Sequence, residues 1–311
     1  MGIFPSRKES WTRKRQTEQP YCILPTILYF CLDHNNIDLS TPAKYIDIEK
    51  IITEKSPNVG KWLPRFLLNG IRGIVHEDEL NHIMRESGHL IGVDFVNACM
   101  EHLDAKVVTH GLENIPATGG VVLASNHPLG GLDGIAFMCA VGRARHDQQF
   151  LVNDILLNIK NFEPLFIPVN KHGANPRFAM KMIDKAFASD SVVMVFPAGL
   201  VSRLIDGKIQ DLEWTKSFVS KAKSYNKNII PVHIGGHNSK RFYRISKWRK
   251  ALGIKANIEM FFLVDEMFKM AGKTIEISFG KPIFSEELKS GPPQKWAKKI
   301  REEVYKLERK N

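Results

Sequence analysis

The stretch from 121 to 134 constrains the fold of this chain more than any other part of the sequence. It starts with small and β-branched apolar residues at 121–124, a pattern typical of a buried strand. The run breaks at Asn126-His127-Pro128 and two glycines, and apolar residues return at helical spacing over 132–140. A strand that passes through a short loop into a helix predicts the carboxyl edge of an α/β sheet, where such sheets carry their sites.

Two side chains of this stretch can act together. Five residues separate His127 from Asp133, so Asp133 falls in the first turn of the predicted helix. A carboxylate there can hold the Nδ1–H of the imidazole and stabilise the imidazolium after Nε2 accepts a proton. The alternative is that Asp133 only caps the helix and His127 is a packed loop residue. The flanking Asn126, Pro128 and glycines favour the first interpretation.

The motif Asn126-His127-Pro128 with Asp133-Gly134 resembles the signature of the glycerol-3-phosphate and lysophosphatidic acid acyltransferases. It is most similar to their hemolysin-like branch, to which the O-acyltransferases of ornithine and glycine lipids are also similar. The main motif has four residues between His and Asp, whereas this chain has five and a Pro after the His. The resemblance covers 107–283. It implies that His127 is the general base. The backbone N–H groups of Gly130 and Gly131 are candidates to bind the developing oxyanion.

A second block of the family resembles 166–171, an apolar strand that ends in Lys171. In the family the basic residue at this point helps to hold the phosphate of the acceptor, so the resemblance implies that Lys171 binds substrate. The alternative is an ordinary exposed Lys at the end of a strand.

The third block of the family, usually Phe-Pro-Glu-Gly-Thr-Arg-Ser, resembles 196–203. It implies that Gly199, Ser202 and Arg203 bind substrate, with the Arg203 guanidinium as the main ligand of an anionic group. Here Ala198 replaces the Glu and the Arg comes two residues later. This departure weakens the transfer of glycerol-phosphate recognition and suits acceptors such as amino-acid lipids.

The fourth block of the family resembles 230–233, an apolar strand that helps to wall the acyl site. His233 and His237 near this strand suggest a metal site together with His127 and Asp133. No further carboxylates and no HExxH-type spacing support that alternative, so we predict no metal.

The net charge of the chain limits the classes of partner that it can bind. A net charge of +11 favours an acidic partner, such as nucleic acid, an anionic membrane face or an acidic carrier protein. No basic run with aromatics marks a nucleic-acid platform, and no zinc-type or RNP-like pattern is present, so we predict no nucleic-acid partner. The four cysteines show no CxxC spacing, and no signal peptide is evident, which predicts a reduced, cytoplasmic protein.

The chain of 311 residues divides into three predicted regions. Residues 1–40 are predicted to be a poorly ordered extension. Residues 41–105 are predicted to be helical, with helices at 46–52, 62–75, 77–86 and 93–103. This region combines the apolar residues Trp62, Phe66 and Leu67 with the basic residues Arg65 and Arg72. Such a composition is typical of interfacial membrane helices. The alternative is that this apolar face covers the core of the domain.

Residues 106–311 alternate strand and helix, which predicts an α/β domain with a mixed, mainly parallel sheet flanked by helices. Strands are predicted at 106–109, 121–125, 149–152, 166–169, 192–196, 229–234, 258–264 and 275–279. Helices are predicted at 132–141, 175–188, 212–225 and 293–307.

We therefore expect an O-acyltransferase that moves a fatty acyl group from an acyl thioester to a hydroxyl of a membrane lipid precursor. The precursor is a lysophospholipid or an N-acyl amino acid lipid. The donor is acyl carrier protein or coenzyme A, no cofactor is needed, and the protein works peripherally at the cytoplasmic face of the inner membrane. One alternative is a non-catalytic, hemolysin-like membrane-surface protein with a degenerate site. A hydrolase is a third hypothesis, but no G-x-S-x-G elbow is present.

Overall fold

The computed structural model describes residues 44–55, 62–153, 159–169, 176–254 and 258–309. The predicted extension at 1–40 and the predicted ligand Lys171 therefore lie outside the described residues. In the described part of the chain, no helix is long and apolar enough to cross a membrane.

A seven-stranded sheet forms the centre of the molecule, in the order β1-β9-β8-β2-β5-β3-β4. Strands β8, β2, β5, β3 and β4 run parallel to one another, whereas β9 runs antiparallel to β8 and pairs in parallel with β1. The predicted mixed, mainly parallel α/β sheet is confirmed. The strands are β1 (Lys106–His110), β2 (Val121–Ser125), β3 (Gln148–Val152), β4 (Phe166–Pro168), β5 (Val192–Val195), β8 (Asn228–Ile234) and β9 (Thr274–Phe279).

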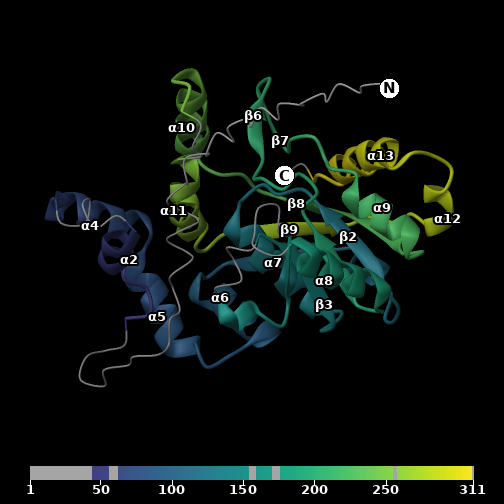
Figure 1. Ribbon diagram of the computed structural model, residues 1–311, viewed down its shortest axis with the longest axis horizontal. Coiled ribbons are helices and arrows are strands. Elements are labelled where there is room, and N and C mark those ends of the chain that lie inside the picture. Colours follow the sequence, from purple (N-terminus) through teal and green to yellow (C-terminus); the bar gives the residue numbers. More distant parts are fainter. Residues whose placement is uncertain (1–43, 56–61, 154–158, 170–175, 255–257, 310–311) are drawn as a thin grey trace, which may run out of the picture.

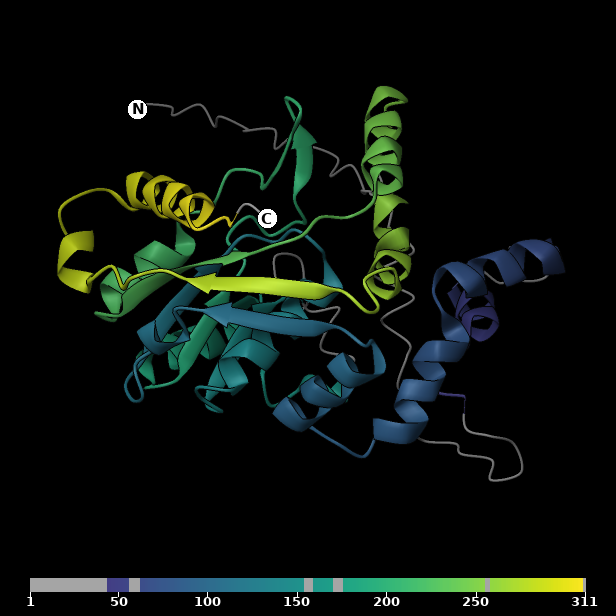
Figure 2. The same ribbon diagram turned by 180° about the vertical axis from the view of Figure 1, so that it is seen from behind.

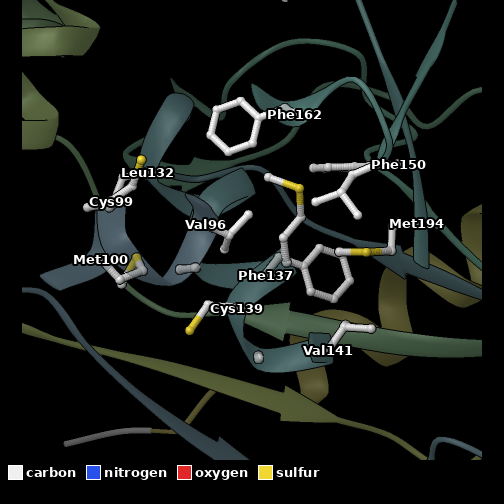
Figure 3. Packing of buried hydrophobic residues seen from close by; sticks show 14 of the residues in the cluster. Val96, Cys99, Met100, Leu132, Phe137, Cys139, Val141, Phe150, Phe162 and Met194 are labelled. Atoms are coloured by element: carbon white, nitrogen blue, oxygen red, sulfur yellow. The ribbon is translucent and has the colours of Figure 1, made fainter. Parts of the chain in front are cut away.

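Strand β2 lies in the middle of the sheet, and its side chains alternate between two hydrophobic clusters. Val121 and Leu123 pack into one cluster with helices α6 (Gly92–His102) and α7 (Gly131–Gly142). Figure 3 shows part of this cluster, where residues of α6 and α7 meet side chains of β3 and β5. Val122 and Ala124 pack into the other cluster. The helices of that face are α8 (Pro176–Ala188), α9 (Ser217–Ser224) and α13 (Pro293–Lys306).

The helical region before the sheet forms as predicted. Its helices are α2 (Ile48–Lys55), α4 (Arg65–Ile74), α5 (Glu77–Ser87) and α6. Buried side chains of these helices belong to the same cluster as one face of the sheet, which ties the region to the α/β domain. Figures 1 and 2 show α2, α4 and α5 at one end of the molecule, and α12 (Ser285–Leu288) and α13 at the other.

The structure differs from the predicted secondary structure at one strand and at the start of one helix, and it contains a helix and a hairpin that were not predicted. The predicted strand at 258–264 is the 3₁₀ helix η4 (Ile258–Phe262) followed by helix α11 (Leu263–Phe268). A short apolar run fits either a strand or a buried helix, so its pattern alone did not decide between them. The predicted helix at 212–225 begins only at Ser217, as α9. Helix α10 (Lys240–Ala251) and the hairpin of β6 (Arg203–Ile205) and β7 (Lys208–Gln210) were not predicted.

Candidate active site

The carboxyl ends of three neighbouring parallel strands bring the site residues to one edge of the sheet. His127 follows β2, Phe196 follows β5, and the loop after β8 leads into α10. The register of β2 with β5 and β8 places these three ends side by side. This is the sheet edge at which the sequence predicts the site.

Asn126 fixes the start of the loop that carries His127. Its side-chain amide donates to the carbonyl of Ile234 at 2.9 Å, and its Oδ1 accepts the N–H of Ile234 at 2.7 Å. The side chain thus replaces one backbone pairing between β2 and β8 just where β2 ends. Beyond it, Asn238 donates to the carbonyl of Pro128 at 3.3 Å and holds the middle of the loop.

Asp133 and His127 meet as the sequence predicts. Asp133 Oδ2 lies 3.0 Å from His127 Nδ1 and also accepts the N–H groups of Leu129 and Gly130, at 2.8 and 3.2 Å. The Asp133 side chain is fully buried, whereas that of His127 is 17% exposed. One carboxylate oxygen therefore both orients the imidazole and caps helix α7, so the two interpretations of Asp133 hold together in this geometry.

The second nitrogen of the imidazole, Nε2, lies on the side of the ring away from Asp133. Within the described residues, His127 Nε2 has no hydrogen-bond partner. The ring stacks on Phe196, with centroids 4.1 Å apart and planes 18° apart, so the ring plane is fixed from one side. A base needs this combination of an oriented ring and an unoccupied nitrogen.

The two predicted oxyanion donors differ in what their N–H groups do. Gly130 has a φ of 89°, which favours glycine, and a Cβ there would lie 2.9 Å from Leu263 of α11. Its N–H is already directed to Asp133. Gly131 is the first residue of α7, where a helix has no carbonyl for the N–H group. Of the two, Gly131 stays the stronger candidate to bind an oxyanion.

The block that follows β5 packs around the His127 loop. Gly199, with a φ of 65°, closes a turn by donating its N–H to the carbonyl of Phe196 at 3.0 Å. Ser202 is buried, and its N–H donates to the carbonyl of His127 at 2.7 Å. The structure thus gives Ser202 a contact with the backbone of the predicted base. The substrate-binding roles of Gly199 and Ser202 stay predictions.

Asp211 is a site residue that the sequence analysis missed. It is buried, and its Oδ1 accepts the hydroxyl of Ser202 at 2.5 Å and the N–H of His127 at 3.2 Å. Its Oδ2 accepts the indole N–H of Trp214 at 2.9 Å. Burial raises the pKa of Asp211 above its ordinary value, and these hydrogen bonds offset only part of that rise. A lone Asp after a short polar segment gave no sequence signal for this role.

Arg203 lies differently from what its predicted role requires. Its side chain is only 4% exposed and pairs with the fully buried Glu259 at 3.2 Å. Glu259 also pairs with Arg249 of α10 at 2.8 Å. The charge of Arg203 is therefore matched inside the protein, between the hairpin, α10 and η4. Binding of the acceptor by Arg203, like that by Lys171, stays a prediction.

We expect Glu259→Ala to lower the free energy of unfolding by about 3–5 kcal/mol, because it leaves two buried guanidinium groups without a counter-charge. Urea unfolding followed by circular dichroism measures this change. Glu303→Ala is the matched control, since the Glu303–Lys306 pair is exposed and worth about 1 kcal/mol or less. Equal losses in the two variants would contradict a structural role of the Glu259 cluster.

Neither described cysteine suits nucleophilic catalysis. Cys99 and Cys139 are buried, and burial raises the pKa of the Cys99 thiol to about 12 and also raises that of Cys139. Among the described residues, no Ser or Cys side chain is hydrogen-bonded to His127. The described part of the site thus lacks the paired nucleophile that the hydrolase alternative needs.

Comparison with known protein families decides where the chain belongs. A family model described as "Acyltransferase" matches residues 50–310, which is most of the chain. The chain belongs to this acyltransferase family. The match includes helices α4 to α6 as well as the α/β domain, so it extends beyond the stretch for which the motifs themselves show a resemblance.

Two curated relatives of this acyltransferase are similar over nearly their whole length. The lyso-glycine lipid O-acyltransferase of Bacteroides thetaiotaomicron is 46% identical over 264 residues, which are 84% of this chain and 97% of that protein. The lyso-glycine lipid O-acyltransferase of Phocaeicola vulgatus is also 46% identical over 264 residues, 84% of this chain and 95% of that protein. Among solved structures, the lysophosphatidic acid acyltransferase PlsC of Thermotoga maritima aligns with a TM-score of 0.45 and 14% identity. It covers 78% of this chain and 88% of its own.

Proposed function

We propose that this acyltransferase esterifies the hydroxyl of a lyso-glycine lipid with a fatty acyl group from an acyl thioester. The main support is the contact between His127 Nδ1 and Asp133 Oδ2 at 3.0 Å. The chain is also 46% identical to two proteins named lyso-glycine lipid O-acyltransferase. Nothing in these comparisons supports the non-catalytic alternative.

The proposed reaction uses the unoccupied nitrogen of His127. Nε2 removes the proton of the acceptor hydroxyl while the oxygen attacks the thioester carbonyl. The buried carboxylate of Asp133 stabilises the imidazolium that results. The N–H of Gly131 stabilises the tetrahedral oxyanion. When the intermediate collapses, the carbon–sulfur bond breaks, and the departing thiolate takes the proton from His127, which regenerates the neutral imidazole.

The acceptor assignment rests on two features. The relatives named for lyso-glycine lipid are similar over 84% of this chain. In addition, Ala198 stands where the third block of the family usually has Glu, a departure that weakens the transfer of glycerol-phosphate recognition. The donor is proposed to be acyl carrier protein or coenzyme A, and the positive charge of the chain suits either acidic carrier.

A competition assay tests the acceptor. The purified protein is given lyso-glycine lipid and lysophosphatidic acid together, with acyl carrier protein or coenzyme A as the thioester carrier, and the products are identified by mass spectrometry. We expect the diacyl glycine lipid to form with the larger kcat/KM. Preferential formation of phosphatidic acid would overturn the acceptor assignment but leave acyl transfer intact.

We also propose that the protein works at a membrane surface, through exposed side chains of α4 and Trp62 just before it. The side chains of Trp62 and Phe66 are 86% and 72% exposed, and Leu67 is 46% exposed. The exposed Arg65 lies among them, whereas Arg72 is paired with Glu49 at 2.9 Å. Exposed aromatic side chains beside a basic residue favour an interfacial helix over a cover of the core.

Replacing Trp62 and Phe66 with Ser should weaken binding to anionic liposomes by about tenfold or more, because burial of each large apolar side chain contributes roughly 1.5–3 kcal/mol. Co-sedimentation at low salt measures the affinity. Phe284→Ser is the control, since Phe284 is 54% exposed and directly precedes α12, which lies at the opposite end of the molecule from α4. If the double variant sediments like the wild type, the face does not dock.

A further inference from the structure

Helix α10 has a basic composition that the reaction does not explain. Its sequence, KRFYRISKWRKA, contains six Lys or Arg residues and no Asp or Glu. Phe242, Tyr243, Ser246 and Arg249 are buried and define the side that faces the protein. The residues exposed on the other side include Lys240, Arg244, Lys247 and Trp248.

The exposed side of α10 combines cations with large apolar side chains. Trp248 is 71% exposed, and Leu252, just beyond the helix, is 74% exposed. Arg244, Trp248 and Leu252 are four residues apart, so they follow one another along one ridge. Lys240 and Lys247 are also exposed on this side. We call these five residues the α10 face.

The three cations of the α10 face form no ion pair in the part of the chain that the structure describes. Across the described ranges, Lys240, Arg244 and Lys247 have no acidic partner within 4.0 Å. Arg241 differs, because it lies 3.7 Å from Asp265 and above the ring of Phe262. These three cations, without a described acidic partner, lie beside an exposed indole. Such a surface favours a partner that offers both negative charge and apolar groups.

Ion pairs and a hydrogen bond connect α10 to the hairpin and to the His127 loop. Arg249 of α10 and Arg203 of the hairpin both pair with Glu259, so the helix and the hairpin form one unit. Leu204 at the hairpin is 49% exposed. Figures 1 and 2 show α10 and the β6–β7 hairpin projecting from the same side of the molecule. At the base of α10, Asn238 donates to the carbonyl of Pro128 in the His127 loop.

We propose that the α10 face, with Leu204 of the hairpin, is a docking surface for an anionic lipid bilayer. The proposal rests on the proposed function, because a membrane lipid must then reach His127 from the bilayer. Trp248 and Leu252 enter the boundary between head groups and acyl chains, and the flanking cations contact lipid phosphates. A bilayer accounts for the apolar side chains as well as the charge, whereas an acidic protein surface accounts chiefly for the charge.

The test compares full-length variants on vesicles of phosphatidylcholine alone and with phosphatidylglycerol. Arg244→Glu/Lys247→Glu reverses two charges, and Trp248→Ser/Leu252→Ser removes the apolar contact. Lys295→Glu/Lys298→Glu is the matched control, because it makes the same charge change on exposed residues of α13. We expect each α10 variant to bind phosphatidylglycerol vesicles about tenfold or more weakly, and the control to lose much less.

The activity readout separates this proposal from the proposed function. With acceptor dispersed in detergent, the α10 variants should turn over like the wild type, and they should lose activity only when the acceptor is in vesicles. Wild-type binding by both variants would overturn the docking surface while leaving acyl transfer intact. An increase in the KM for acyl carrier protein with unchanged vesicle binding would assign the α10 face to the carrier instead. No transfer by the wild type in detergent would overturn the proposed function, while the vesicle measurement would still decide the docking surface.

Discussion

His127→Ala is expected to lower kcat for acyl transfer by about 10²–10⁴-fold, the contribution typical of a general base. The structure supports this expectation because His127 Nε2 has no partner within the described residues, while Nδ1 is held by Asp133. The thioester carbonyl would then be attacked by a hydroxyl that no side chain deprotonates. Initial rates with saturating donor and acceptor measure the change.

The same variant must be shown to fold. Removal of the imidazole also removes its stacking on Phe196, so the unfolding midpoint in urea is compared with that of the wild type. His146→Ala is the matched control, because His146 is exposed and precedes β3 at the opposite edge of the sheet. A folded His127→Ala protein with activity within tenfold of the His146→Ala control would rule out the base mechanism.

Asp133→Asn is expected to lower kcat by up to about 10⁴-fold, as when the carboxylate partner of a catalytic imidazole is neutralised. An Asn oxygen at the Oδ2 position can still accept the N–H groups of Leu129 and Gly130, so the cap of α7 is retained. What disappears is the negative charge that stabilises the imidazolium. The acceptor KM should change little, because Asp133 is buried behind His127.

Asp133→Ala provides the comparison that separates chemistry from capping. It removes both the charge and the helix cap, and loss of a cap costs about 0.5–2 kcal/mol of stability. If Asp133→Asn kept full activity while Asp133→Ala lost stability, Asp133 would act only as a cap. If both lose activity but only the Ala variant loses stability, the orienting role holds.

The parts of the site that the sequence predicted are those whose geometry is local. His127 and Asp133 are six residues apart, and one strand-to-helix turn is enough to bring their side chains together. Strand β2 was predicted with its observed bounds for the same reason, because its apolar run ends sharply at Asn126. Local sequence patterns were therefore enough to predict both the central strand of the sheet and the position of the proposed base.

The parts that could not be predicted depend on contacts between distant segments. Arg203 meets Glu259 across 56 residues, and Glu259 lies in a run whose apolar pattern indicated a strand. Asp211 holds the N–H of His127 across 84 residues. Neither Glu259 nor Asp211 belongs to a local sequence motif. A buried carboxylate is satisfied by hydrogen-bond donors that come together only in the folded chain.

The products of a labelled donor show most directly whether His127 drives transfer of an acyl group to a lipid hydroxyl. The purified protein receives a radiolabelled acyl thioester and lyso-glycine lipid, and the label is followed into ester product and free fatty acid. We expect one released thiol per new ester, almost no free fatty acid, and loss of ester formation in His127→Ala. Free fatty acid as the main product, or ester formation by His127→Ala at the wild-type rate, would rule out transfer driven by His127.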